Sequence, residues 1–410
     1  MVRETFARKL FCSYAEACCV KNMLNGLFVN MKIIADENIT FIHEVFGGLG
    51  QVETFAGRSI TAEQVKGADV LLVRSVTQVN EALLYGSRVK FVGTCTIGTD
   101  HIDEVYLARQ GIGFSAAPGC NANAVVDYVI STLVVLAQRH EAGFDLFSRC
   151  VGIVGVGNVG RRLKSRLEAM GVRCVCSDPL RNDDEAQGFV SLEELFAQAD
   201  IISLHVPLTV GDEHGTHHLF NAANLLRLKD HTILINTARG PVVDNDALQD
   251  VLAQRPDMTA VLDVWECEPE VDVALLGHVT LATPHIAGYS LDGKVRGTQM
   301  VYQALCQYFK LPELIDVMSL APQVVPIPIA ESAQQTGCDG ALDSVLQCYD
   351  VRRDDEAFRQ VMTPVNAERA ASFDSLRKNY PVRRELVVTP VTNVGNEPLR
   401  LALSAVGFAC

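Results

Sequence analysis

The sequence predicts an α/β protein built on parallel β-sheets, and three observations support this fold class. Short apolar runs alternate with helix-length spacers in two successive series. The runs are apolar throughout, as expected for parallel strands that are covered on both faces. Residues 151–162 read VGIVGVGNVGRR, an apolar run followed by glycines at the spacing G-x-G-x-x-G. We expect a strand, a glycine-rich turn and a helix at that position.

The composition is that of a folded protein with two or three domains. The chain has 410 residues, of which 48% are hydrophobic and 20% charged, and domains average roughly 150 residues. Its net charge of −14 argues against non-specific binding to nucleic acid or to an anionic membrane. Its 13 cysteines are scattered in apolar runs, which favours free thiols and a cytoplasmic location. Cys174 and Cys176 lack a second pair at zinc spacing, so we expect no metal site.

The first series of runs begins at Met31. Residues 1–30 read differently, carry no clear secretory signal and form an extension of uncertain status. Five strands are predicted between residues 31 and 123, in the runs MKIIAD, QVETFA, ADVLLVRS, VKFVGTCT and GIGFSAA. The next segment, NAVVDYVISTLVVLAQRH, has helical periodicity, with Asn123 or a nearby polar residue available as a cap.

The second series predicts six strands, the number in a complete dinucleotide-binding domain. They lie in the runs CVGIVGVG, GVRCVCSD, ADIISLHVP, HTILINTARG, TAVLDVWE and VTLATPHIAG. An amphipathic helix follows, in GYSLDGKVRGTQMVYQALCQYFK, and then a proline-rich linker, LAPQVVPIPIA. From about residue 322 the chain becomes more polar, with basic clusters in DVRRDDEAFR and LRKNYPVRRE.

The glycine-rich turn predicts a nucleotide site of the Rossmann type. Gly155 allows the tight turn, Gly157 lets the backbone approach a pyrophosphate, and Gly160 lets helix and strand pack closely. The next strand ends in Asp178, near the offset at which an acid meets the adenosine ribose. That acid favours NAD over NADP, although Arg181 close behind could offset the preference. Asp178 could instead cap the turn that follows it.

Three polar residues follow separate strands of the second series: Arg239, Glu268 and His285. Ligands of open parallel sheets bind beyond the carboxyl ends of the strands. Each residue also has a plain interpretation, as a surface charge, part of an acidic loop and a histidine bonded within a turn. Together they suit oxidation of a 2-hydroxy acid, in which the guanidinium binds the carboxylate and the imidazole removes the hydroxyl proton. The acid would orient the imidazole and stabilise its protonated form.

The blocks GIVGVGNVGRR, INTARG, LDVWECEPE and TPHIAGYS resemble the signatures of the D-isomer-specific 2-hydroxyacid dehydrogenases, which depend on NAD. The resemblance implies a Rossmann domain inserted into a flavodoxin-like substrate domain. It places the substrate domain at residues 31–123 and 284–318 and the NAD domain at 124–283. Residues 322–410 would form a C-terminal α+β dimerisation domain, which implies a homodimer.

Further blocks between Met31 and about Glu385 resemble one branch of this family, which acts in bacterial vitamin B6 synthesis. They are ADENI, GRSI, VRSVTQVNEALL, FVGTCTIGTDHID, SAAPGCNANAVVDY, YDVRRDD and LRKNYPVRRE. The resemblance implies a four-carbon 2-hydroxy acid with a terminal phosphate as substrate, and Arg239, Glu268 and His285 as catalytic residues. The implied NAD contacts are Gly155, Gly157, Asn158, Val159, Gly160, Asp178, Val206, Thr237, Ala238, Arg239, Asp263 and Gly288. The implied substrate contacts are Ser75, Thr96 and Tyr289. At Val206 the family more often has threonine, so one hydroxyl contact to the cofactor would be missing.

Other polar residues leave alternatives open. Arg74 could bind a substrate anion or form a structural ion pair, and the hydroxyl of Thr96 could simply bond the backbone. Residues 99–103, TDHID, could hold an acid/base pair of His101 and Asp103, but we favour a helix cap. His214, His217 and His218 lie in a polar loop with no carboxylate or cysteine pattern beside them, and we interpret them as solvated.

The basic residues of the C-terminal region also have two interpretations. Arg352, Arg353, Arg377 and Lys378 could pair with acids such as Asp354, which is our preferred interpretation, or could reach a substrate phosphate from a partner subunit. Two alternative functions stay open. One is a sister dehydrogenase acting on phosphoglycerate or hydroxypyruvate, and the other is a non-enzymatic NAD-sensing protein like the related corepressors.

Overall fold

The computed structural model describes residues 31–139, 145–181, 188–211, 213–330, 338–363 and 368–410. The predicted N-terminal extension lies outside them. The chain divides into two compact units. Unit 1 comprises the chain up to Ala117 together with Val295–Leu320, and unit 2 comprises Pro118–Lys294 and Ala321–Cys410. In the described parts of the chain, no helix has the length and apolar character needed to span a membrane.

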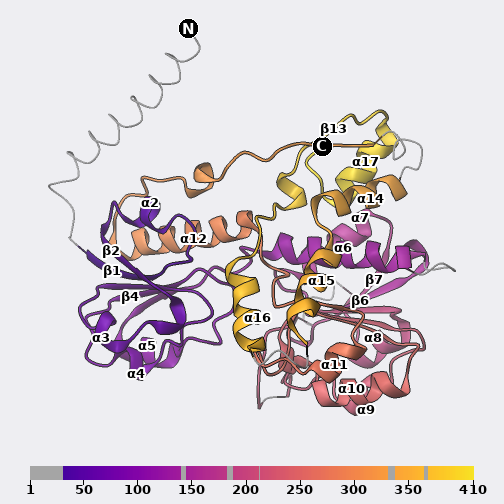
Figure 1. Ribbon diagram of the computed structural model, residues 1–410, viewed down its shortest axis with the longest axis horizontal. Coiled ribbons are helices and arrows are strands. Elements are labelled where there is room, and N and C mark those ends of the chain that lie inside the picture. The colour runs from indigo at the N-terminus through magenta and orange to yellow at the C-terminus, as the bar shows by residue number, and fades with distance from the viewer. Residues whose placement is uncertain (1–30, 140–144, 182–187, 212, 331–337, 364–367) are drawn as a thin grey trace, which may run out of the picture. The chain divides into compact units, whose positions relative to one another are not determined.

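Unit 1 contains a parallel five-stranded sheet in the order β2-β1-β3-β4-β5 (Figure 1). All five predicted runs form strands: β1 (Met31–Asp36), β2 (Gly50–Phe55), β3 (Val70–Val73), β4 (Phe91–Thr94) and β5 (Gly113–Ser115). Its helices are α2 (Ile42–Phe46), α3 (Ala62–Val65), α4 (Glu81–Leu84), α5 (Glu104–Gln110) and most of α12 (Leu291–Phe309). Every residue of β3 and β4 is buried, which explains their unbroken apolar runs.

Unit 2 contains a parallel six-stranded sheet in the order β11-β10-β9-β8-β6-β7. The six predicted runs are confirmed as β6 (Cys150–Val154), β7 (Arg173–Ser177), β8 (Ile201–Leu204), β9 (Ile233–Asn236), β10 (Thr259–Leu262) and β11 (Leu281–Ala282). The chain leaves β6 toward β7 on one side and later returns to β8 on the other. The carboxyl end of β6 is therefore the switch point of the sheet, where such folds bind nucleotides.

Helices cover both faces of this sheet (Figure 1). They are α6 (Ala122–Arg139), α7 (Gly160–Ala169), α8 (Leu192–Gln198), α9 (Ala222–Leu225), α10 (Asn245–Gln254) and α11 (Val273–His278). The predicted long helix is α6, and it begins at Ala122, so Asn123 lies inside it rather than at its cap.

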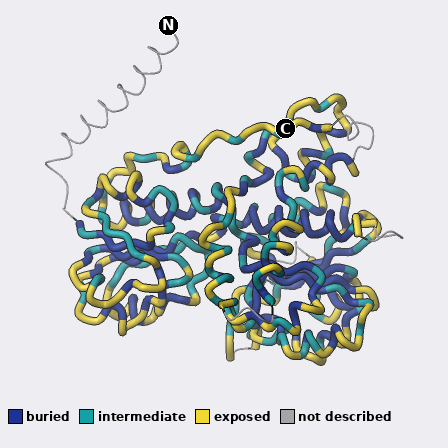
Figure 2. Tube along the Cα trace, viewed as in Figure 1, coloured by how far each residue is buried: buried dark blue, intermediate teal, exposed yellow. Residues whose placement is uncertain are grey.

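The apolar runs of unit 2 are explained by burial on both faces of its sheet. Val151 and Ile153 of β6 pack into a core that includes residues of α6 and α7. The neighbouring Cys150 and Val154 pack into a second core with residues of α8, α10 and α11. Successive side chains of a strand point to opposite faces, so both sets of positions must be apolar. Figure 2 shows most of each strand in this sheet as buried.

The C-terminal segment packs against the sheet of unit 2. It contains β12 (Ile327–Pro328), α14 (Cys338–Cys348), α15 (Val351–Val361), α16 (Arg369–Lys378), β13 (Val391–Thr392) and α17 (Glu397–Val406). Asp355 of α15 accepts a hydrogen bond from the backbone N–H of Ala282 in the edge strand β11 (2.8 Å). Arg359 donates to the carbonyls of Leu276 (3.0 Å) and Val279 (2.6 Å) just before that strand. The segment therefore completes one edge of the sheet.

Candidate active site

The glycine-rich turn joins β6 to α7 at the switch point. Gly155 has a φ of +85°, and a Cβ there would lie 2.8 Å from the carbonyl oxygen of His205. A Cβ at Gly160 would collide with the carbonyl oxygen of Gly155. A Cβ at Gly157, in contrast, would meet no heavy atom within 4 Å. Two glycines thus satisfy the packing of the turn, and the third leaves its backbone open to a ligand, as a pyrophosphate site requires.

Asp178, at the end of β7, contacts this turn. Its Oδ2 accepts a hydrogen bond from the backbone N–H of Val156 at 2.8 Å. Arg181 donates to the carbonyl of the same residue at 2.6 Å. The carboxylate therefore supports the glycine-rich turn, and the 3₁₀ turn Pro179–Arg181 follows it directly. The guanidinium that could have admitted a 2′-phosphate is engaged by the same turn.

Glu268 and His285 form a pair at the ends of β10 and β11. The Nδ1 of His285 lies 2.8 Å from Oε2 of Glu268. The other carboxylate oxygen of Glu268 accepts a hydrogen bond from the backbone N–H of Trp265 at 2.8 Å. Burial raises the pKa of Glu268, but His285, Arg377 and the Trp265 N–H together bring it below its ordinary value. Glu268 is thus ionised at neutral pH, and no hydrogen bond from the described residues reaches the Nε2 of His285.

Asp263 holds the turn that carries His285. It is buried, and it accepts hydrogen bonds from the hydroxyl of Thr283 (2.6 Å) and from the N–H groups of Ile286 (2.7 Å) and Ala287 (2.9 Å). His285 itself has a φ of +56°, a left-handed conformation that costs energy for a residue with a side chain. The bonds to Asp263 stabilise that conformation. Asp263 was predicted from the sequence only as a cofactor contact, and its role in positioning His285 was not.

Arg239 follows β9 in a turn that Asn236 fixes. The side chain of Asn236 accepts from the N–H of Ala238 (3.0 Å) and donates to the carbonyl of Arg239 (3.0 Å). Thr237 lies beside His205, which follows β8, with 3.4 Å between Oγ1 and Nδ1. Burial lowers the pKa of His205 to about 3, so this ring is neutral. Sequence reasoning missed Asn236 and His205, although a polar residue ending an apolar run was a signal for both.

The remaining predicted cofactor residues are found in unit 2. Asn158 accepts a hydrogen bond from Arg161 within the glycine-rich turn (2.8 Å), and Val159 is the residue before α7. Val206 lies against the turn, since its Cγ1 would be 2.7 Å from a Cβ at Gly155. A Cβ at Gly288 would collide with the side chain of Asn121, so the backbone packs closely there.

The predicted substrate residues are divided between the units. Ser75 and Thr96 lie in unit 1 and Tyr289 in unit 2. Ser75 is exposed after β3. Thr96 bonds Thr94 at 2.8 Å and donates to the carbonyl of Gly98 at 3.3 Å, so its hydroxyl does bond the backbone.

Two alternatives in unit 1 are decided by contacts. The Nε of Arg74 pairs with the buried Asp36 at 3.2 Å, which is the structural ion pair. Asp103 caps α5 by accepting from the N–H of Tyr106 at 2.8 Å, as we favoured. The Nε2 of His101 lies 3.0 Å from Oγ1 of Thr94.

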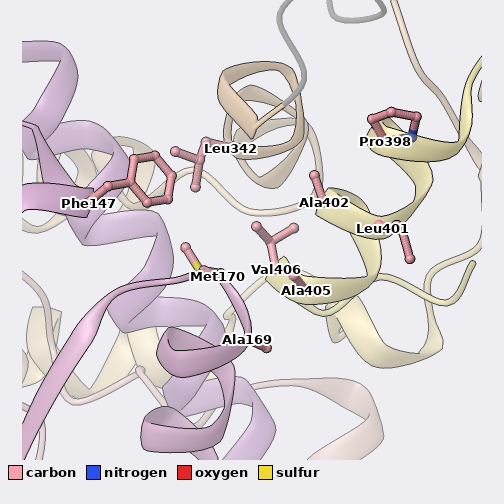
Figure 3. A pocket seen from close by; sticks show the side chains of 9 residues that line it. All are labelled: Phe147, Ala169, Met170, Leu342, Pro398, Leu401, Ala402, Ala405 and Val406. Atoms are coloured by element: carbon pink, nitrogen blue, oxygen red, sulfur yellow. The ribbon is translucent and has the colours of Figure 1, made fainter.

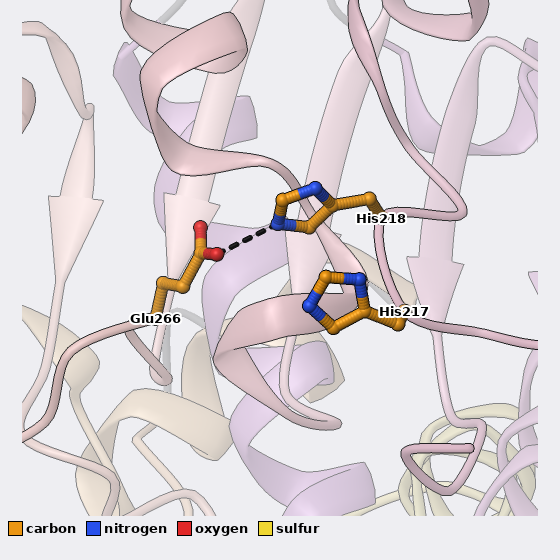
Figure 4. Close-up of side chains that lie close together, drawn as sticks. All are labelled: His217, His218 and Glu266. Carbon is orange, nitrogen blue, oxygen red and sulfur yellow. Dashed lines mark hydrogen bonds and ion pairs between the residues drawn. The ribbon is translucent and has the colours of Figure 1, made fainter. Parts of the chain in front are cut away.

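The interpretation of His218 as solvated is wrong. Its Nε2 lies 2.7 Å from Oε1 of Glu266 (Figure 4). Its Nδ1 lies 3.6 Å from Oδ2 of Asp244. His217 stacks on it with 4.0 Å between ring centroids. The ring nitrogens of both histidines and the Glu266 oxygen lie within 4.8 Å of one another. Glu266 lies in the turn after β10 and Asp244 caps α10, both far from His218 in the sequence, which is why the local sequence did not reveal them.

A hollow of about 240 Å³ lies elsewhere in unit 2, between α7, α14 and α17 (Figure 3). Its lining is almost entirely apolar: Phe147, Ala169, Met170, Leu342, Pro398, Leu401, Ala402, Ala405 and Val406. Leu401 is 57% exposed and Phe147 36%. The hollow offers no group for acid/base chemistry and is not part of the candidate active site.

Comparisons with known proteins agree with this arrangement. Residues 128–287 match the family model of the D-isomer specific 2-hydroxyacid dehydrogenase NAD binding domain, and residues 323–407 match a domain of unknown function, DUF3410. Erythronate-4-phosphate dehydrogenase of Pseudomonas entomophila (strain L48) is 49% identical over 92% of this chain and 98% of its own length. The enzyme of the same name from Azotobacter vinelandii is 49% identical over 92% of this chain and 99% of its own.

A solved D-lactate dehydrogenase from Aquifex aeolicus, complexed with NAD and lactic acid, is 26% identical and has a TM-score of 0.56. The match covers 68% of this chain and 95% of that one. A cofactor-bound 3-phosphoglycerate dehydrogenase of Entamoeba histolytica shares the fold, with a TM-score of 0.59 over 69% of this chain and 96% of its own, at 24% identity. The chain carries an NAD-binding domain and belongs to the D-isomer-specific 2-hydroxyacid dehydrogenase family, among its erythronate-4-phosphate dehydrogenases.

Proposed function

We propose that the chain oxidises 4-phospho-D-erythronate at C2 to 2-oxo-3-hydroxy-4-phosphobutanoate, with NAD⁺ as oxidant, in the synthesis of pyridoxal 5′-phosphate. The relatives named for this activity align with almost the whole chain. The observation that carries the proposal is the 2.8 Å contact between Nδ1 of His285 and Glu268. It orients the imidazole and stabilises its protonated form.

In the proposed reaction the C2–H bond breaks and its electron pair leaves with the hydrogen. NAD⁺, when bound, supplies the carbon that accepts this hydride. His285 takes the hydroxyl proton on Nε2 as the C2–O double bond forms, and Glu268 stabilises the resulting imidazolium. Arg239 binds the C1 carboxylate in a bidentate manner and polarises the adjacent oxygen. In the reverse direction His285 is the proton donor.

The residues that would hold NAD fit it in two respects. The open backbone at Gly157, beside the first turn of α7, suits a pyrophosphate because helix N-termini attract anions. The carboxylate of Asp178 beside that turn suits ribose hydroxyls and repels a 2′-phosphate. The other proposed contacts are Gly155, Asn158, Val159, Gly160, Val206, Thr237, Ala238, Arg239, Asp263 and Gly288, with Ser75, Thr96 and Tyr289 for the substrate.

The test is to follow NADH absorbance after adding 4-phospho-D-erythronate to purified protein, with and without an oxo-acid that reoxidises bound NADH. We expect turnover with this substrate and much lower kcat/KM with D-3-phosphoglycerate. Hydroxypyruvate with NADH tests the other sister activity. The variant Arg239→Ala should lose most turnover, and near-normal activity in it would contradict the role of Arg239. Absence of any NADH, even in a single turnover, would refute the proposal.

We also propose that the protein is a cytoplasmic homodimer that pairs through residues 322–410. Its substrate domain would comprise residues 31–123 and 284–318, and its NAD domain residues 124–283. The exposed Leu401 beside the apolar hollow supports a protein interface, because apolar patches of this kind are covered in assemblies. The described cysteines are free thiols, as in a reducing compartment. Light scattering of the wild type and of Leu401→Asp tests the dimer. A wild-type monomer would refute it.

A further inference from the structure

Arg377 projects from the C-terminal segment toward the candidate active site. It lies in the last turn of α16, and its guanidinium carbon is 5.5 Å from the ring centroid of Tyr289 and 5.7 Å from that of Phe373. Its Nε is buried and has no hydrogen-bond partner. Within the described part of the chain, no ion pair joins this guanidinium to a carboxylate.

Two of the carboxylates near Arg377, those of Glu268 and Asp263, are engaged by other groups. The charges of Glu268, Asp374 and Asp263 all act on the guanidinium, as does the Tyr289 hydroxyl. Glu268, however, spends one oxygen on His285 and the other on the Trp265 N–H. Asp263 is likewise bonded by the turn that carries His285. Arg377 thus lies in a negative environment, while its buried Nε–H has no acceptor.

Three other arginines of the C-terminal segment are hydrogen-bonded by the protein itself. Arg383 also keeps one buried nitrogen, Nη1, without a partner, but its Nη2 donates to the carbonyls of Ala124 (2.8 Å) and Ala287 (2.5 Å). Arg384 pairs with Asp292 at 2.7 Å, and Arg359 binds Asp355 and two backbone carbonyls. Burying a charged group without partners is costly unless something else satisfies it. The difference at Arg377 therefore points to a ligand rather than to a structural pair, contrary to our preferred interpretation of this residue.

The surroundings favour an anion. Lys294 lies over the same Tyr289 ring, with its Nζ 4.7 Å from the centroid. Tyr289 is fixed edge-to-face against Tyr380 (5.7 Å between centroids). Two cations therefore flank one aromatic ring, close to the Glu268 and His285 pair. An arginine fork matches a phosphate in a bidentate manner better than any other side chain does.

We propose that Arg377 binds the terminal phosphate of the substrate, next to His285 and within the same chain. This inference rests on the proposed function, which assigns the other anionic end of the substrate, the C1 carboxylate, to Arg239. The C-terminal segment would then supply the residue that distinguishes a phosphorylated 2-hydroxy acid from an unphosphorylated one. Lys294 adds positive charge at the same ring.

The experiment compares Arg377→Met and Arg377→Lys with Arg353→Met, an exposed arginine of α15 in the same segment. For 4-phospho-D-erythronate we expect kcat/KM to fall about 100- to 1,000-fold in Arg377→Met and about 10-fold in Arg377→Lys, mainly through KM, because charge-assisted hydrogen bonds are lost. For D-erythronate, which lacks the phosphate, kcat/KM should change less than about threefold. Arg353→Met should match the wild type with both substrates.

A second measurement does not depend on turnover. Inorganic phosphate should raise the melting temperature of the NADH-loaded wild type and of Arg353→Met, but not that of Arg377→Met. If the phosphate effect follows Arg377 while the wild type turns over no 4-phospho-D-erythronate, the proposed function fails and the anion site stands.

Three results would overturn the anion site. One is unchanged kcat/KM in Arg377→Met. Another is an equal loss with both substrates in Arg377→Met and Arg377→Lys, which would mark a structural role for the guanidinium. The third is a phosphate shift that persists in Arg377→Met. Should Arg377→Met fail to fold, Arg377→Lys alone decides, since it keeps the charge and loses the fork.

Discussion

The carboxyl ends of the two parallel sheets are built differently. In unit 1, Asp36 at the end of β1 pairs with Arg74 after β3, and the hydroxyl of Thr94 bonds His101. These polar groups satisfy one another. In unit 2, His285 uses one ring nitrogen on Glu268, and we propose that the other binds the substrate. Polar residues at strand ends therefore mark chemistry only where the protein leaves part of their bonding capacity unused.

The largest effect is expected in unit 2, at His285 and Glu268. The variant His285→Ala should lose about 10³- to 10⁴-fold in kcat, since it removes the proton acceptor. Glu268→Gln should cost less, because it keeps the hydrogen bond and loses the charge. The pKa of Glu268 lies below its ordinary value, so the carboxylate stays charged as pH falls from 8 to about 5. Steady-state rates measured against pH check the losses in both variants and the charge state of Glu268. If the wild type lost activity above pH 5 and Glu268→Gln did not, Glu268 would be titrating in that range, which would contradict its lowered pKa.

Breaking the ion pair of unit 1 should affect stability instead of chemistry. Arg74→Met leaves the buried Asp36 without its cation, which we expect to cost about 3 kcal/mol of unfolding free energy. Chemical denaturation measures that loss, and Arg88→Met, which removes an exposed arginine of unit 1, serves as its control. If Arg74→Met kept full stability but lost turnover, Arg74 would belong with the substrate residues after all.

The glycine-rich turn contains both a residue that the packing requires, Gly160, and one that faces open space, Gly157. Gly160→Ala forces a Cβ against the carbonyl of Gly155 and should destabilise the protein by about 1–3 kcal/mol. Gly157→Ala meets open space, so its stability should match the wild type while NAD affinity falls. Thermal unfolding and NADH fluorescence titration separate these effects. If the two variants lost the same stability and the same NADH affinity, Gly160 would not be specific to packing, nor Gly157 to the approach of the ligand.

The smallest effect is expected at Thr96. Its hydroxyl already bonds Thr94 and the Gly98 carbonyl, so Thr96→Val should lower kcat/KM for the phosphorylated substrate less than about tenfold, the cost of one neutral hydrogen bond. Initial-rate kinetics with the wild type as reference measure this. A loss of several hundredfold would mean that unit 1 contributes to the chemistry itself.

Much of the fold was predictable because burial on both faces leaves a local signature. The runs that form β1–β5 and β6–β11 could be identified from apolar character, and the turn at Gly155 from its glycine spacing. Side-chain partners were harder, because they join strand ends that lie far apart in the sequence. Nothing local to His218 indicated Glu266, and nothing local to Arg377 indicated Tyr289 more than eighty positions earlier. Helix α6 begins at Ala122, one residue before Asn123, and a difference of this size is usual when helix ends are predicted from sequence.

Asp355, which bonds the N–H of Ala282 in the edge strand, has a consequence for biogenesis. A ribosome makes this acid some seventy residues after the strand that it completes, so the nascent chain presents an open sheet edge until residue 355 has been made. Unpaired edges of this kind recruit other strands. Truncation of the chain before Asp355 would consequently release a dehydrogenase core prone to aggregation, not a shortened working enzyme.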